Sequence, residues 1–322
     1  MKRMLCALLL LALALSLAAC RTEDTTENGQ REIEIVTTVF PAYDFARQIA
    51  GERASVLLLV PPGAESHSFE PTAKDLLRIQ SCTLFFCNGG ESEAWVEELL
   101  EDQELETLVM LDCVEALEEE HKEGMQQIRE HEHEDHDHED HEEEEGPEYD
   151  EHVWTSPVNA ICICEALCQR LCELDPEGAD LYRANLAVYR AELERLDAAF
   201  RQVVEQGSLG TVVFADRFPV RYFVEEYGLD YFAAFPGCAD DTEPSARTVA
   251  FLIDKVRQEG IPAVFYIEFS NEKMADVICE DTGCRKLLFH SCHTVSKAEL
   301  EGGVSYLQLM WGNVDALKEA LG

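Results

Sequence analysis

The sequence has few basic residues for its length. Its 322 residues include 25 Lys and Arg against 65 Asp and Glu, which gives a formal net charge of −40 at pH 7. A negative charge of this size repels phosphate groups, so it argues against binding to nucleic acid or to anionic lipid head groups. The same charge is compatible with attracting cations.

The sequence also lacks a second apolar run long enough to cross a membrane. A short basic start precedes an apolar stretch of mainly Leu and Ala that ends in Ala18-Ala19-Cys20. This pattern is typical of a secretory signal and is short for a membrane span. Because small residues directly before a cysteine resemble the bacterial lipoprotein processing site, we predict a signal peptide over 1–19, lipidation of Cys20 and a tether over 20–31. Ordinary secretion with removal of Cys20 is the alternative.

Thirteen cysteines in an exported chain raise the question of a disulfide framework. Such frameworks are typical of small domains without a core, whereas the roughly 300 residues after the signal suffice for two domains with cores. Cys162, Cys164, Cys168 and Cys172 recur within an apolar helical pattern. We therefore interpret them as buried free thiols rather than as a metal cluster.

Short β-branched runs alternate with amphipathic stretches along most of the chain. The runs cover 33–39, 56–60, 83–87 and 107–111, and then 211–215, 263–267 and 287–290. Strands separated by helices indicate parallel sheets built from βαβ units. The sequence therefore predicts an α/β fold with two domains, 32–174 and 207–322, each with a parallel sheet flanked by helices.

The segment between these domains contains no Pro or Gly after Gly178 until Gly207. Apolar residues recur in it at helical spacing from Leu181 to Phe200. The pattern predicts one linking helix over 175–206, about 45 Å long. Such a helix would join the domains as a stiff strut.

Residues 115–151 are dominated by Glu and Asp, with six interleaved histidines: His121, His131, His133, His136, His138 and His141. Low hydrophobicity and high like charge predict disorder in the free state. Imidazoles and carboxylates are both ligands for zinc and similar ions, so we interpret this acidic tract as an accessory metal collector with weak, exchanging sites. The alternative is a solvated acidic loop with incidental histidines.

The remaining histidines are His67, His152, His290 and His293. Three of them lie in loops that follow strand-like runs, and ligands of open parallel sheets bind beyond the carboxyl ends of the strands. Histidines contributed by several separate loops are what a site between two domains requires.

Two of these loops carry recognisable motifs. Residues 62–72 read Pro-Gly…His…Glu-Pro-Thr around His67, and residues 150–157 read Asp-x-His-x-Trp-x-Ser-Pro around His152. In this order, with an acidic His-rich loop before the second motif, they resemble the metal-binding solute receptors of ABC transporters, of the zinc type. The resemblance covers nearly the whole mature chain.

The resemblance implies a periplasmic-binding-protein-like fold of the metal-receptor type. It implies that His67 and His152 from the first domain and His293 from the second are metal ligands. It further implies a monomer at the extracytoplasmic face of the cell membrane, with a divalent metal ion and an ABC permease and ATPase as partners.

The sequence departs from the family pattern at one ligand position. About ten residues before Tyr227-Gly228-Leu229, zinc receptors of the family carry a third His and manganese receptors a Glu, whereas this chain has Asp216-Arg217. Arg217 stays protonated and cannot bind a cation. Either Asp216 supplies a carboxylate oxygen, or Arg217 pairs with a nearby carboxylate and water fills the fourth position.

Three imidazoles and one oxygen suit zinc (Zn2+) better than manganese (Mn2+), which favours more carboxylate. A manganese- or iron-type receptor and an adhesin-like metal-binding lipoprotein are the alternatives. A zinc hydrolase would need a general base, for which Glu268 or Glu65 would have to serve. Because no nucleophile and base pair is legible, we predict that the protein is not an enzyme.

Overall fold

The structure is a computed structural model that describes residues 33–64, 69–96, 105–126, 148–237, 239 and 244–322. Residues 33–322 belong to one compact unit. The predicted signal peptide and tether lie outside the described residues. Among the described residues, no helix is both long and apolar enough to cross a bilayer.

The first half of the chain forms a four-stranded parallel sheet in the order β2-β1-β3-β4. Its strands are β1 (Ile33–Thr37), β2 (Ala54–Leu58), β3 (Leu84–Cys87) and β4 (Thr107–Val109). The helices of this half are α2 (Phe40–Ala50), α3 (Ala73–Ser81) and α5 (Pro157–Leu174), with short 3-10 turns η1 (Gly51–Arg53), η2 (Glu91–Glu93), η3 (Leu111–Cys113) and η4 (Val153–Thr155).

The second half repeats this strand order as β6-β5-β7-β8, again with parallel pairs. Its strands are β5 (Thr211–Phe214), β6 (Asp230–Ala233), β7 (Ala263–Tyr266) and β8 (Arg285–Leu288). Its helices are α7 (Arg221–Tyr227), α8 (Ala246–Glu259), α9 (Lys273–Thr282), α10 (Lys297–Glu301) and α11 (Tyr306–Leu321). Because the strands of each sheet are parallel, the loops that follow them lie at the same edge of that sheet, where ligands of such sheets bind.

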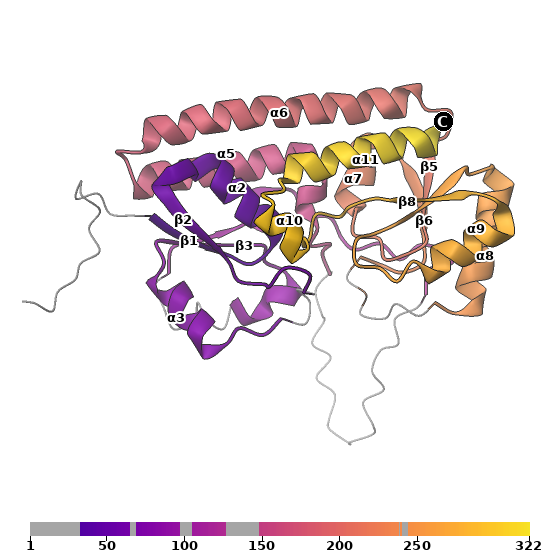
Figure 1. Cartoon of the computed structure of the whole chain (residues 1–322), viewed down its shortest axis with the longest axis horizontal. Helices are drawn as coiled ribbons and strands as arrows, with labels where there is room; N and C mark the ends of the chain where they lie inside the picture. Colours follow the sequence, from indigo (N-terminus) through magenta and orange to yellow (C-terminus); the bar gives the residue numbers. More distant parts are fainter. Residues whose placement is uncertain (1–32, 65–68, 97–104, 127–147, 238, 240–243) are drawn as a thin grey trace, which may run out of the picture. The chain divides into compact units, whose positions relative to one another are not determined.

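A long helix, α6 (Ala179–Gln206), follows α5 and packs against α5 and α2 of the first half and α11 of the second (Figure 1). Its 28 residues span about 42 Å. It begins four residues after the predicted start because Asp175 caps the end of α5 and accepts hydrogen bonds from Arg53 Nε (2.7 Å) and Tyr182 Oη (2.6 Å).

The predicted α/β fold with two parallel sheets is confirmed. The β-branched runs locate most strands to within a few residues, but they miss β6, which begins two residues after Gly228 at the end of α7. Cys164 and Cys168 are buried free thiols as predicted, and Cys172 is half-buried. The same interpretation is wrong for Cys162, which is exposed on α5.

Candidate metal-binding site

His152 is a buried histidine at the start of η4, immediately after the acidic tract. Asp150 Oδ1 accepts a hydrogen bond from His152 N at 2.8 Å and lies 3.2 Å from His152 Nδ1. A proton held on Nδ1 by this carboxylate leaves Nε2 as the unprotonated ring nitrogen, the usual tautomer of a metal-binding histidine. Burial lowers the pKa of His152, but the Asp150 carboxylate raises it, and the net shift is upward.

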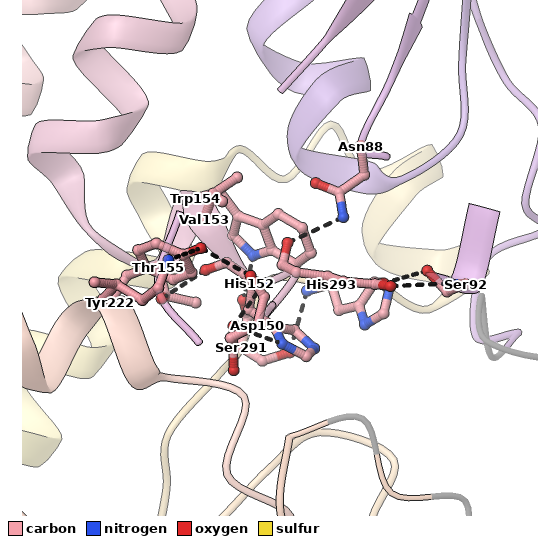
Figure 2. Close-up of polar contacts among 12 residues, drawn as sticks. Asn88, Ser92, Asp150, His152, Val153, Trp154, Thr155, Tyr222, Ser291 and His293 are labelled. Atoms are coloured by element: carbon pink, nitrogen blue, oxygen red, sulfur yellow. Dashed lines mark hydrogen bonds and ion pairs between the residues drawn. The ribbon is translucent and has the colours of Figure 1, made fainter. Parts of the chain in front are cut away.

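His293 comes from the loop that follows β8 and meets His152 across the two halves. The ring centroids are 5.5 Å apart and nearly perpendicular, and the Trp154 ring lies 5.5 Å from His152 and 5.3 Å from His293 (Figure 2). Phe40 N, at the start of α2, donates to His293 O at 3.3 Å. Two of the predicted ligands are therefore neighbours.

A cavity of about 230 Å³ lies beside these two rings. Its lining includes Gly63, Ala64 and His152 from the first half and Arg217, Glu268 and His293 from the second. Gly63 N donates to Thr294 Oγ1 at 3.0 Å, so the loop after β2 reaches the loop after β8. His67, three residues beyond the end of this described segment, lies outside the described residues.

Glu268 supports the His293 loop from the end of β7. Its carboxylate accepts hydrogen bonds from Ser291 N (2.7 Å) and Ser291 Oγ (2.5 Å), and Ser291 Oγ accepts one from His293 N at 3.2 Å. Its side chain is only 8% exposed. Glu268 is therefore not a surface carboxylate: it orients the segment that presents His293.

Asp216, the predicted fourth ligand, lies at the end of β5 with its carboxylate already engaged. Its oxygens accept hydrogen bonds from Arg217 N (2.8 Å) and Ile267 N (3.3 Å), and burial raises its pKa. It lines a neighbouring cavity of about 380 Å³ together with Arg217 and Phe269, which line both cavities. Its role as a metal ligand stays a prediction.

His290 is held in a separate buried network. Its Nδ1 accepts a hydrogen bond from Cys292 N at 2.9 Å, and its backbone exchanges two bonds with Asn313, at 2.7 and 2.8 Å. Glu268 Oε1 lies 3.5 Å from the same Nδ1, but the shorter bond from Cys292 N requires an unprotonated Nδ1. This network fixes the turn between β8 and His293.

The acidic tract begins and ends at a paired neck. Glu118 and Tyr149 form an antiparallel bridge, and Asp150 N donates to Leu117 O at 2.9 Å. His121 is exposed near the neck. The other tract histidines lie outside the described residues, namely His131, His133, His136, His138 and His141. Cys20 also lies outside them.

Within the part of the chain that the structure describes, no group of three or more His, Cys, Asp and Glu side chains is arranged to hold a metal ion. The sequence analysis did not identify the residues that hold the two predicted ligands in place. Asp150 could have been found from the sequence, because an Asp two residues before a His can orient the imidazole ring. The hydrogen bonds between Ser291 and Glu268 have no signal in the sequence.

Two parallel α/β halves bridged by a long helix, with histidines from both halves beside one cavity, define a metal-binding solute receptor. Residues 35–320 match the model of the family described as zinc-uptake complex component A, periplasmic, and the chain belongs to that family. The predicted family is therefore confirmed. Members of this family are substrate-binding receptors for zinc uptake, so the prediction that the protein is not an enzyme is also confirmed.

Relatives with known names agree with this family. The high-affinity zinc uptake system protein ZnuA of Bacillus subtilis is 29% identical over 95% of this chain and 94% of its own length. The zinc-binding lipoprotein AdcA of Streptococcus pneumoniae is 30% identical over 95% of this chain, which spans 58% of the length of AdcA.

Solved structures extend the likeness to three dimensions. The Zn(II)-bound ZnuA-like domain of AdcA matches with a TM-score of 0.73 at 27% identity, over 90% of this chain and 99% of that one. The laminin-binding protein Lmb of Streptococcus agalactiae, described as both adhesin and metal transporter, matches with a TM-score of 0.72 at 22% identity over 90% of this chain and 100% of that one. The second match is a likeness of fold alone.

Proposed function

We propose that this protein captures one zinc ion between its two halves and delivers it to the permease and ATPase of an ABC transporter. Zinc is the cargo. The observation that carries the proposal is the juxtaposition of His152 and His293, which come from different halves and lie beside one cavity. The Zn(II)-bound relative and the family of zinc-uptake receptors support zinc as the ion.

The proposed ligands are His67, His152 and His293, with Asp216 or a water molecule in the fourth position. Neutral imidazoles and one oxygen at tetrahedral positions make a closed site for zinc. The Asp150 carboxylate would strengthen the His152 ligand by holding the proton on Nδ1. Because histidine has to be unprotonated to bind, capture weakens as the pH falls through the imidazole range.

We further propose that the chain is a monomer anchored to the outer face of the cell membrane through a lipid on Cys20. Residues 20–31 would be the tether, and 32–174 and 207–322 would be domains joined by α6. The name of AdcA, a zinc-binding lipoprotein, supports the anchor. The tract from His121 to His141 would collect zinc weakly at the same surface.

Calorimetry on the mature protein tests the proposal. We expect one tight zinc site in the wild type and several weaker ones. A variant lacking residues 127–147, which preserves the neck, should keep the tight site and lose weak binding. His293→Ala should lose the tight site, whereas His290→Ala, which removes the acceptor of the Cys292 amide, should keep the tight site with a smaller loss of affinity. If the deletion removes the tight site, the assignment to His67, His152 and His293 is wrong.

A further inference from the structure

The loop that presents His152 is held from the opposite half by the hydroxyl of Tyr222. Tyr222 lies on α7 in the second half and is 3% exposed. Its Oη donates to Asp150 O at 2.8 Å (Figure 2). The same oxygen accepts a hydrogen bond from Leu117 N at 3.1 Å. Because Asp150 N also donates to Leu117 O, the hydroxyl closes a ring of three hydrogen bonds at the neck of the acidic tract.

The ring of bonds at the neck is connected directly to the zinc ligand. Asp150 is bound by its backbone to Tyr222 and by its carboxylate to both the amide and the ring of His152. A shift of the Asp150 backbone therefore moves the carboxylate that orients the imidazole. Groups that orient a metal ligand change metal affinity although they do not touch the metal.

The second half also holds the loop on the other side of His152. Tyr306 Oη donates to Trp154 O at 2.7 Å, and Trp154 Nε1 donates to Ser291 O at 2.8 Å. The first half contributes Asn88, whose Nδ2 donates to Glu151 O at 3.0 Å. Hydrogen bonds thus hold the backbone on both sides of His152, and those of Tyr222 also join the two ends of the acidic tract.

We propose that Tyr222 is a positioning residue for zinc capture, which fixes the Asp150–His152 loop through its hydroxyl. This inference rests on the proposed zinc-binding function. Tyr222 is 105 residues from Leu117 and 72 from Asp150 in the sequence, and it is not among the residues that line the cavity. Loss of the hydroxyl removes a buried hydrogen-bond partner from Asp150 O and from Leu117 N, which favours a rearranged loop.

The test compares Tyr222→Phe with Tyr227→Phe. Both substitutions remove one buried hydroxyl from α7, but Tyr227 Oη donates to Asp197 Oδ1 on α6, away from the cavity. We expect Tyr222→Phe to raise the zinc Kd about tenfold, within the range for groups that orient metal ligands. Tyr227→Phe should leave the Kd within about twofold of the wild type, even if both variants lose similar thermal stability.

Two further readouts separate positioning from general stability. Cobalt bound in place of zinc should show an altered visible absorption spectrum in Tyr222→Phe alone. In the metal-free wild type, the Leu117 amide should be as protected from hydrogen exchange as the Asp150 amide, and Tyr222→Phe should remove the protection of Leu117. The wild-type exchange measurement remains decisive if the variant does not fold.

An unprotected Leu117 amide in the wild type overturns the inference. So does an unchanged zinc Kd in folded Tyr222→Phe, or an equal loss in Tyr227→Phe. Absence of tight zinc binding in the wild type itself would instead refute the proposed function. The two failures are therefore distinguishable.

Discussion

Gly237 lies against the His152 loop so closely that a single methyl group should disturb the zinc site. A Cβ at residue 237 would lie 3.0 Å from Phe218 O, 3.1 Å from Asp150 Oδ2 and 3.3 Å from His152 Cε1. Non-bonded heavy atoms normally rest about 3.5–4.0 Å apart, so each neighbour would have to move by several tenths of an ångström. Asp150 and His152 are each 1% exposed, and the open space beside His152 is the cavity itself, so a shift of either residue would alter the site.

Gly237→Ala should therefore cost about 1–3 kcal/mol of stability, the usual range for an overpacked site. If about 1 kcal/mol of this strain is relieved by displacing His152 or Asp150, the zinc Kd rises about fivefold. Calorimetry and thermal unfolding measure the two effects. Gly210→Ala is the matched control, because its added Cβ meets nothing within 4 Å. Equal zinc affinities in the two variants would show that the close packing of Gly237 against Asp150 and His152 does not affect the site.

Three further predictions concern the pH dependence of stability, the histidine ligands, and Arg217, at which this chain departs from the family pattern. Burial raises the pKa of Glu93 to about 7 from its usual 4.5, so the stability it contributes is present below pH 4.5 and lost as the pH rises to about 7. Chemical denaturation at several pH values should show the wild type losing ~3 kcal/mol relative to Glu93→Gln over this interval, and a constant difference would contradict the burial argument. His293→Ala should raise the zinc Kd at least about 100-fold in a calorimetric titration, and far more than His290→Ala, which removes only a support of the turn before His293; equal effects would require a different site. Arg217→His should raise the affinity for zinc more than that for manganese in a competition titration, because it places a neutral imidazole in the cavity instead of a fixed positive charge; a loss of zinc affinity would show that Arg217 supports the site.

Much of the fold is legible in the sequence because the buried parallel strands are short β-branched runs. The run at 33–39 becomes β1, and the one at 211–215 becomes β5. β6 escapes this reasoning because Asp230–Ala233 combines one acidic residue with two aromatics in a strand of four residues. The sequence also does not show that α6 begins only at Ala179, because the Asp175 carboxylate binds Arg53, which is 122 residues away in the sequence.

The candidate site was predictable where a motif lies within one loop and not where it depends on contacts between loops. His152 and its partner Asp150 are two residues apart, so their relation is local. The proximity of His293 to His152 follows from the packing of the two halves, which the pattern of strands implies only coarsely. The support of His293 by Glu268 joins the ends of two neighbouring strands, and only the fold shows which strands these are.

X-ray absorption at the zinc edge would show directly whether histidines from both halves hold the zinc ion. The sample should be the variant lacking residues 127–147 with one equivalent of zinc, so that five of the six tract histidines are absent. We expect about three imidazole nitrogens and one oxygen at about 2.0–2.1 Å from the zinc, and a loss of imidazole scattering in His152→Ala. Sulfur ligands at about 2.3 Å, or a shell of oxygen alone, would contradict this expectation.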